Sequence, residues 1–357
     1  MTPETLRARI KAGEALVDLD LRQMHLTPGD YAGAILVRCD LRGMVLEGVD
    51  LRDSQFSQCQ LQDTRWDDAQ LHQCVFHRCD ASRARMRVSH IEEMAWSDCK
   101  AIGLDLSGAT LVSINFVRTD VTDIHLTGAK IERSTFTECV WGKADMSLTR
   151  QEHVLYFRGD LTQVILTDAH WESVVCVEGD LSGQDLRGQT LLRCQLTECR
   201  LDGCNFQDAL LAQTSFKGAS LKGALLIGAR APRALFVHAD MRNSHCQGGQ
   251  FAQSLWADAC LDRADFSGAD LTQGILHRAR CDRTSFMSAQ LEYADFSYAD
   301  LSQADFRGSR FMRTQFHRAL TVDTRWGDRA GLLEKDALLF EAEQWSARRP
   351  AALGAGR

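Results

Sequence analysis

Residues Leu261–Phe316 read LDRADFSGADLTQGILHRARCDRTSFMSAQLEYADFSYADLSQADFRGSRFMRTQF. A large apolar residue occurs at every fifth position of this stretch, and a small residue such as Ala264, Ala269 or Ala289 lies two positions before it. A period of five fits neither an α-helix, which repeats at about 3.6 residues, nor a β-strand, which repeats at two. The stretch therefore indicates a repeat architecture.

The five-residue register continues without a slip from Leu16 to Trp326, which makes 63 units. Of the 63 central positions, 58 hold Leu, Ile, Val, Met, Phe, Tyr, Trp or Cys, and the position two before is small or Val in 53 units. Both positions must point inward, because a narrow coil has room for one large and one small side chain on each side. The other three positions carry the Asp, Arg, Gln and Lys residues and form the outer surface.

The aromatic residues add a longer period to this register. Of the 22 aromatic residues at central positions, 11 fall in one column whose members are separated by four units or a multiple of four. This column predicts four units in each coil, with rings stacked above rings in successive coils. Its members are Phe56, Phe76, Trp96, Phe116, Phe136, Tyr156, Phe216, Phe236, Trp256, Phe296 and Phe316.

The repeat resembles that of the pentapeptide-repeat family, whose unit reads A-(D/N)-L-x-x. Ala269-Asp270-Leu271 and Ala299-Asp300-Leu301 match this unit outright. The resemblance implies an all-β fold, a right-handed quadrilateral β-helix (a pentapeptide-repeat solenoid) with one pentapeptide on each side. The units make about 16 coils, and a strand spacing of about 4.8 Å gives a rod roughly 75 Å long.

Three segments are expected along the chain. Residues 1–15 form an N-terminal capping helix, since Leu6 and Ile10 lie four residues apart on one helical face; the alternative is an arm that binds a partner. Residues 16–326 form the β-helix. Residues 327–357 form an amphipathic C-terminal helix and a short flexible tail. This helix either caps the last coil or joins two copies of the chain in a homodimer.

One stretch, residues 147–157, interrupts the pattern. Gln151 occupies a central position there, and Phe157 lies at an outward one. The regular pattern resumes at Leu161, so any bulge is local and does not divide the β-helix. We interpret the stretch as a surface loop or an irregular corner, with a contact site as the alternative.

The 13 cysteines do not indicate a metal site or disulfides. All but Cys260 lie at inward positions, and Cys39, Cys59, Cys79 and Cys99 each lie four units after the one before. They are expected to stack at about 4.8 Å, which is too far for a disulfide with Cβ atoms about 3.5–4.5 Å apart. A straight column also cannot supply tetrahedral zinc ligands. We interpret the cysteines as core residues in a reducing compartment.

The sequence contains no pattern typical of a catalytic or cofactor site. The 11 histidines are scattered over outward positions, and no CxxC, HExxH, glycine-rich phosphate loop or GxSxG occurs. Asp residues that precede a central Leu, such as Asp40, Asp180 and Asp270, are expected to bond backbone groups at the corners. We therefore predict a protein that is not an enzyme and that holds no metal or cofactor.

Function is then expected at the surface, and the family resemblance offers DNA mimicry as one kind. Some pentapeptide-repeat proteins bind type II topoisomerases such as DNA gyrase and confer resistance to quinolones or toxins. Duplex DNA as long as the rod carries roughly 44 negative charges, whereas residues 16–326 hold 41 acidic and 33 basic side chains. The excess lies in the first half, with 26 acidic against 16 basic side chains through residue 182 and 15 against 17 after it. These charges count against mimicry, which stays as the alternative, and against direct nucleic-acid binding.

The other kind of function is a protein-interaction scaffold or adaptor, which we favour. A short helix ending in LRARIKAGEAL, followed by Leu19-Asp20-Leu21, resembles the opening of pentapeptide-repeat proteins associated with type VI secretion. That resemblance implies an accessory protein that loads a secretion-system spike or effector protein. No apolar run approaches about 18 residues and no signal region is visible, so we expect a cytoplasmic protein without a membrane span.

Outward residues that break the polar pattern are the candidate contacts with a protein partner, as opposed to ordinary solvated side chains. They are the exposed pair Tyr293 and Tyr298, Phe157 beside the irregular stretch, and the cluster Arg83, Arg85 and Arg87.

Overall fold

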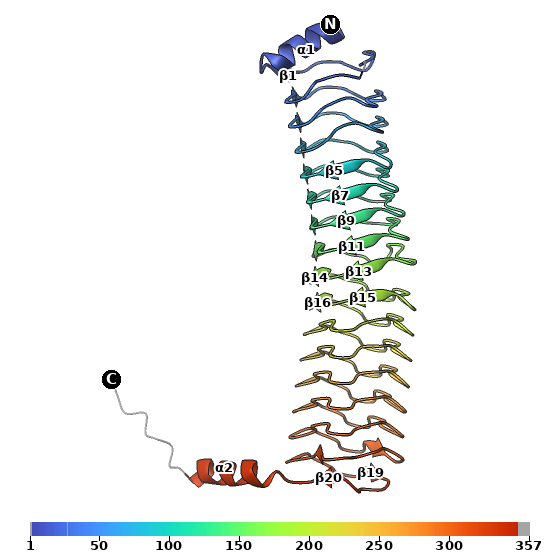
Figure 1. Ribbon diagram of the computed structural model, residues 1–357, viewed down its shortest axis with the longest axis vertical. Coiled ribbons are helices and arrows are strands. Elements are labelled where there is room, and N and C mark those ends of the chain that lie inside the picture. The colour runs from blue at the N-terminus through green and yellow to red at the C-terminus, as the bar shows by residue number, and fades with distance from the viewer. Residues whose placement is uncertain (1, 27, 349–357) are drawn as a thin grey trace, which may run out of the picture.

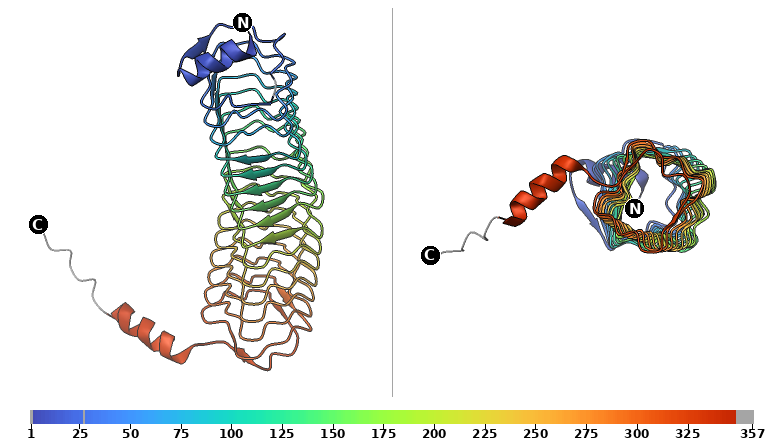
Figure 2. Two further views of the ribbon diagram at one scale, coloured as in Figure 1. Left: turned by 45° about the horizontal axis from the view of Figure 1, so that its top comes forward. Right: turned by 90° about the horizontal axis from the view of Figure 1, so that it is seen from below.

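The computed structural model describes residues 2–26 and 28–348 of the chain. It shows one long rod of stacked parallel coils with a short helix at each end, as the sequence predicts (Figure 1). Seen along its axis, the coils lie one above another (Figure 2). No helix among these residues is long and apolar enough to cross a membrane.

Two parallel sheets run along the rod, and two short strand pairs close it. The ten-stranded sheet contains β1 (Ala15–Val17), β2 (Ile35–Val37), β3 (Gln55–Ser57), β4 (Val75–His77), β6 (Ala95–Ser97), β8 (Asn115–Val117), β10 (Thr135–Thr137), β12 (Leu155–Phe157), β14 (Val175–Val177) and β16 (Gln195–Thr197). The six-stranded sheet contains β5 (His90–Glu92), β7 (Thr110–Val112), β9 (Lys130–Glu132), β11 (Arg150–Glu152), β13 (His170–Glu172) and β15 (Thr190–Leu192). At the end of the rod, β17 (Asp305–Phe306) pairs with β19 (Arg325–Trp326), and β18 (Thr314–Gln315) pairs with β20 (Leu332–Leu333).

Partners in adjacent coils lie four units apart in the sequence throughout both long sheets. Leu16 lies beside Leu36 in the ten-stranded sheet, and isolated bridges such as the one between Asp20 and Asp40 continue the pairing on the other sides. Each coil therefore has four sides of five residues, which confirms the four-sided β-helix.

Each side ends in a corner at the second residue after the central one. Asp18, Arg38 and Gln58 occupy such corners with φ angles of 55°, 54° and 55°. This left-handed conformation is uncommon for residues other than glycine and costs about 1–2 kcal/mol. Turn bonds such as the one from Met24 N to Leu21 O (2.8 Å) hold the corners, together with the bonds between coils.

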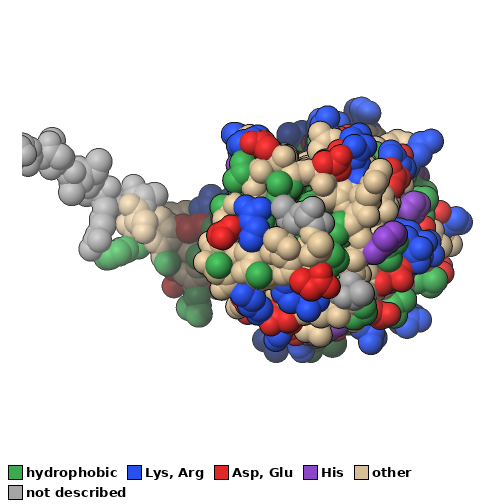
Figure 3. Space-filling model, turned by 90° about the horizontal axis from the view of Figure 1, so that it is seen from above, with side chains coloured by type: hydrophobic (Ala, Val, Ile, Leu, Met, Phe, Trp, Pro, Cys, Tyr) green, Lys and Arg blue, Asp and Glu red, His purple; other side chains and the backbone are tan. Residues whose placement is uncertain are grey.

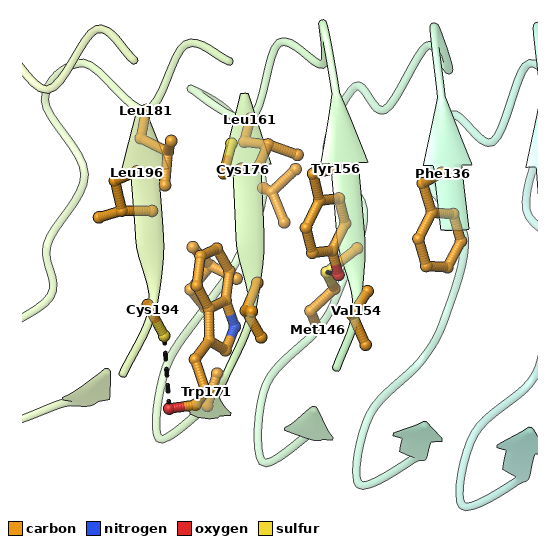
Figure 4. Close-up of a cluster of buried hydrophobic side chains, with 14 of the residues drawn as sticks. Phe136, Met146, Val154, Tyr156, Leu161, Trp171, Cys176, Leu181, Cys194 and Leu196 are labelled. Atoms are coloured by element: carbon orange, nitrogen blue, oxygen red, sulfur yellow. Dashed lines mark hydrogen bonds between the residues drawn. The ribbon is translucent and has the colours of Figure 1, made fainter. Parts of the chain in front are cut away.

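The predicted column of rings forms the centre of the core. Phe76, Trp96, Phe116, Phe136 and Tyr156 stack in turn with centroid distances of 4.0, 5.7, 5.4 and 5.3 Å and interplanar angles of 5–10°. Each stacked pair contributes about 0.5–1.5 kcal/mol beyond the burial of its area. Figure 4 shows the rings of Phe136 and Tyr156 on successive strands, both pointing into the coil.

Helix α1 (Pro3–Lys11) lies on the first coil. Leu6 and Ile10 on one of its faces are buried against the solenoid core. The Thr2 hydroxyl accepts a hydrogen bond from the Thr5 backbone N–H (3.3 Å) at the start of the helix, as an N-cap should. The guanidinium of Arg7 donates to the hydroxyl of Tyr31 (3.1 Å), so the helix is also tied to the fourth side of the first coil.

The prediction of a C-terminal helix beginning at residue 327 is wrong in its boundary. Thr314 pairs with Leu332 in the strand pair β18 and β20, whereas the regular spacing would place Glu334 beside it. The last coil is thus two residues shorter than the others, and Leu332 packs against the core. Gly331 makes the tight corner with a φ of 87°, where a Cβ atom would clash with the carbonyl oxygen of Phe311.

Helix α2 (Ala337–Arg348) begins after Asp336, whose Oδ1 accepts the Leu339 N–H (2.9 Å). It projects sideways from the end of the rod and does not lie over the last coil (Figures 1 and 2). Leu338 on this helix is 80% exposed. The flexible tail predicted for the C-terminus lies largely outside the described residues.

The expected bulge or loop at 147–157 is also wrong, because β11 and β12 keep the register of their neighbours on both sides. Gln151 is fully buried. Its Nε2 donates to Thr149 Oγ1 (3.0 Å), and its Oε1 accepts from the hydroxyl of Tyr156 (2.7 Å). A polar side chain fits the central position because two neighbouring groups satisfy it.

This buried pair gives a stability prediction. Tyr156→Phe leaves the Gln151 carbonyl oxygen without its donor, so we expect the free energy of unfolding to fall by about 1–3 kcal/mol. The double variant Gln151→Leu with Tyr156→Phe replaces both polar partners by apolar groups and is expected to recover most of that loss. Chemical denaturation followed by fluorescence measures both, with Tyr293→Phe on the surface as the control. A double variant less stable than the single one would contradict the pairing.

Candidate interaction surface

The aspartates before central leucines are occupied by the backbone, as predicted. Oδ1 of Asp40, Asp180 and Asp270 accepts the N–H of the residue two positions later at 3.1, 2.9 and 2.9 Å. In Asp20 the carboxylate also binds the Arg22 guanidinium, which lowers the pKa of Asp20 to about 2. These carboxylates stabilise corners, and their geometry does not pair them for acid–base chemistry.

The cluster Arg83, Arg85 and Arg87 is not a free basic patch. Arg83 forms two hydrogen bonds of 2.7 Å with the carboxylate of Asp63 in the preceding coil, and its guanidinium lowers the pKa of that carboxyl. Arg85 approaches Asp67 at 3.4 Å, and Arg87 binds the carboxylate of Asp105. The three side chains remain about half exposed, so each can still meet a partner as one member of an ion pair.

The two tyrosines predicted to be an exposed pair have different surroundings. Tyr293 is 46% exposed, and its hydroxyl meets only the sulfur of Met312 (3.9 Å). The hydroxyl of Tyr298 donates to the carboxylate of Glu343 on α2, and the ring contacts His277 edge-on at 5.0 Å. The expectation of an exposed pair is therefore corrected for Tyr298, because α2 covers it in part.

Phe157 lies on the outer face of β12 and is partly exposed. The Arg158 guanidinium lies over its ring at 4.8 Å from the centroid, and Arg158 also pairs with Glu178 in the next coil (2.8 Å). Phe157 is thus an apolar side chain on the outer face of the ten-stranded sheet, beside the charged corner residue Arg158.

Sequence reasoning missed the contact between α2 and the rod. Glu343 accepts from Tyr298, Arg318 and His317, the last at 3.3 Å. These hydrogen bonds lower the pKa of Glu343, and the one from Tyr298 has the largest effect, ahead of those from Arg318 and His317. His317 is almost fully buried, and its Nδ1 accepts the Asp336 N–H (3.2 Å). No signal in the repeat predicts this, since the five-residue pattern places His317 at an outward position.

Within residues 2–26 and 28–348, no group of three or more His, Cys, Asp and Glu side chains is arranged to hold a metal ion. Recesses between coils, such as the one lined by Asp168, Asp185, Arg187 and Asp208, are open and polar. Seen from the N-terminal end, acidic and basic side chains lie next to each other around the rod (Figure 3). The geometry thus offers an extended surface of mixed charge.

The cysteines lie where the sequence places them. All 13 are free, and all but Cys260 are buried. The thiols of Cys39 and Cys79 donate to carbonyl oxygens of the preceding coil, both at 3.3 Å. Burial raises the pKa of Cys74 to about 12 and that of Cys139 to about 11.

Comparison with known proteins identifies the repeat. A family model described as pentapeptide repeat region matches residues 49–126, and a model of eight pentapeptide repeats matches residues 32–63, 180–218, 219–255, 264–301 and 289–319. No curated protein matches the chain significantly. The comparisons give no support to the likeness to type VI secretion proteins.

Several solved structures are similar to this chain. HetL, a pentapeptide repeat protein involved in heterocyst differentiation regulation in the cyanobacterium Nostoc, is 22% identical over 64% of this chain and 90% of its own, with a TM-score of 0.30. QnrB1, a plasmid-mediated fluoroquinolone resistance protein, is 17% identical over 67% of this chain and 97% of its own, with a TM-score of 0.21. At such values the likeness carries no functional conclusion.

Thiol labelling tests the burial of the cysteines. A disulfide reagent should modify one thiol per native chain, that of Cys260, and all the others only after denaturation. Burial, and then the charge of Asp262, raise the pKa of Cys260, so its labelling rate should keep rising with pH through the usual thiol range because only the thiolate reacts. Cys260→Ser should abolish the native reaction. Rapid native labelling of several thiols would show that the core opens.

Proposed function

Because the chain belongs to the pentapeptide-repeat family, we propose that it is a non-enzymatic scaffold or adaptor that binds proteins. The observation that carries the proposal is the division of a rigid surface into long faces of different chemistry. The ten-stranded sheet presents neutral residues, whereas the six-stranded sheet presents charged columns such as Lys130 and Arg150 beside Glu132 and Glu152.

Rigidity favours binding over such faces. Every coil is bonded to the next through its backbone, so outward side chains keep fixed spacings before any partner arrives. A preorganised surface loses little conformational entropy on association. A chain of this kind can hold a partner along its length without a cleft.

The partner class is the finer part of the proposal. The opening helix and Leu19-Asp20-Leu21 support a spike or effector protein of a secretion system, as an accessory role in type VI secretion requires. Only that short likeness supports this class. The candidate contacts are Tyr293, Phe157 and the arginine cluster.

DNA mimicry is the second candidate, and the acidic first half of the rod favours it. Half of its aspartates are, however, paired with arginines. Asp40 and Asp50 bind Arg42 and Arg52 at 2.6 and 2.7 Å, and Asp63 binds Arg83. Paired charges do not form the continuous acidic stripe that a duplex presents, so the scaffold is the better supported function.

The arginine cluster provides a test of the scaffold. We expect a partner protein to co-purify with the tagged protein from its native host and to be lost when Arg83, Arg85 and Arg87 are changed to Gln. The matched control changes Arg230, Arg233 and Arg263 to Gln on distant coils and should retain the partner. Surface changes of this kind alter stability by about 0.5 kcal/mol or less, so circular dichroism should show all three proteins folded. Equal capture by both variants would remove the cluster from the contact.

Gyrase protection separates the two candidates. We expect little protection of DNA gyrase from quinolones at micromolar protein and no enzymatic turnover. Potent protection that is lost when Asp67, Asp68 and Asp123 are changed to Asn would overturn the scaffold and establish the mimic.

A further inference from the structure

The outer face of the ten-stranded sheet is uncharged along its whole length. Its ten strands contain no Asp, Glu, Lys or Arg residue, although a quarter of the chain is charged. The six-stranded sheet, by contrast, carries charged residues in most of its strands, among them Lys130, Arg150 and Glu172. Depletion of charge distinguishes the centre of protein interfaces from the rest of the surface. This face therefore has the composition of an interface core.

Charged corners border the neutral face on both sides. Along the edge that follows it, Arg78, Asp98, Arg118, Glu138, Arg158 and Glu178 alternate in sign from coil to coil. Some of them already pair within the chain, as Asp98 does with Arg118 at 2.8 Å. These six residues are complementary to their own reversed order. When the order is reversed about the midpoint between Arg118 and Glu138, every positive residue takes the place of a negative one and every negative residue that of a positive one.

That reversal is what a two-fold axis perpendicular to the rod does to a second copy placed face to face. It sets Arg118 opposite the partner's Glu138, Asp98 opposite the partner's Arg158, and Arg78 opposite the partner's Glu178. On the other edge, Glu93 meets the partner's His153, and Asp53 meets the partner's Arg193. No like charges face each other on either edge.

Other registers are worse. A shift of the axis by half a coil sets Arg118 opposite its own copy, and a shift by a full coil sets Glu198 opposite Asp18 or Asp98. Opposed like charges disfavour association and help to fix the register of a complex. Shifts of two or more coils toward the N-terminal end, such as an axis between Arg78 and Asp98, oppose no like charges, but the two rods then overlap over eight coils or fewer instead of twelve. The charges and the length of overlap together favour the axis between Arg118 and Glu138.

The neutral residues fit in the same alignment. Leu155 lies opposite the partner's Ala95, and Phe157 lies opposite the partner's Ser97, so large side chains meet small ones. Val75 lies opposite the partner's Val175. Sheets pack face to face about 10 Å apart with interdigitated side chains, and both copies have the same spacing between strands, so the fit repeats along the rod without drifting.

The area is sufficient for a stable dimer. In this alignment the eight strands from β3 to β16 face one another, and β2 and β1 face the coils of Phe216 and Phe236, where Lys217 lies opposite the partner's Val37. The twelve overlapping coils at about 4.8 Å extend over roughly 53 Å, and a side of five residues is at most about 16 Å wide. The face therefore offers about 850 Å² per copy, close to the roughly 800 Å² per partner of a standard interface. Helix α2 leaves the rod on the same side but several coils further along, at Tyr298 and His317, so it does not obstruct the overlap.

We propose that a second copy of this chain packs antiparallel on the ten-stranded sheet, about a two-fold axis between the coils of Phe116 and Phe136. In the dimer Phe157 contacts the second copy and is no longer open to another protein. Tyr293, the arginine cluster and the charged six-stranded sheet of both copies remain open to other proteins.

Light scattering after size exclusion, together with sedimentation velocity, tests the proposal on the full-length protein. The wild type should be a dimer at micromolar concentration. Val175→Glu places a charge opposite the partner's Val75 and should raise the dissociation constant by roughly tenfold or more. The matched control, Val112→Glu on the six-stranded sheet, should leave the dimer intact, and circular dichroism should show both variants folded.

A charge exchange tests the register itself. Arg118→Glu alone and Glu138→Arg alone each create two repulsive contacts in the homodimer and should weaken it. An equimolar mixture of the two variants restores both pairs across the interface and should form the heterodimer. A monomeric wild type would overturn the proposal, and so would a dimer that survives Val175→Glu but dissociates when residues 337–357 are deleted. A mixture no more dimeric than its components would overturn the alignment.

Discussion

The constraint on which this structure depends is the bonding of each coil to the next with a period of four units. Leu21 N donates to Asp40 O and Asp40 N donates to Leu19 O, both at 2.8 Å, and equivalent bonds recur along the rod. The backbone of one coil is therefore satisfied only by the coil beside it. A residue consequently has as its neighbours the residues four units before and after it, so a column in the sequence is also a column in space.

Much of the fold could be predicted because residues that share a column in the sequence also lie in one column in the structure. The rings from Phe56 to Tyr156 stack because the period places them above one another, and the cysteine column is buried for the same reason. Gln151 shows the limit of the argument. A composition rule treats a polar central residue as a break, whereas the period also supplies Thr149 and Tyr156 as its partners. Pattern alone does not reveal that a polar residue has been satisfied.

The candidate site was less predictable, because the repeat determines only where a side chain points. Arg83, Arg85 and Arg87 do point outward, but their ion pairs depend on which acidic residues occupy the preceding and following coils. Tyr298 and His317 are covered by α2, which lies outside the repeat and has no period to place it. Leu332 continued the solenoid with a shortened coil because Gly331 permits a tighter corner than the others. Each difference between prediction and structure occurs where a contact depends on residues or segments that the five-residue register does not determine.

A four-sided period also lets each face of the rod change its chemistry without affecting the others. The central position and the position two before it are shared with the core, whereas the two residues that flank the centre point outward and can contact flanking residues of the same side in adjacent coils, as Arg87 does with Asp105. The corner residues must tolerate a positive φ, and they stabilise the rod through pairs such as Arg158 with Glu178.

Alternation of sign is the arrangement that gives each corner an opposite charge above and below it. When such a column is placed against an antiparallel copy of itself, positive residues can meet negative ones. The alternation that forms ion pairs within one rod therefore also makes its edge suitable for contact with an antiparallel second copy. Alternation by itself permits several such alignments, and the ends of the alternating run together with the length over which the rods overlap favour the one between Arg118 and Glu138.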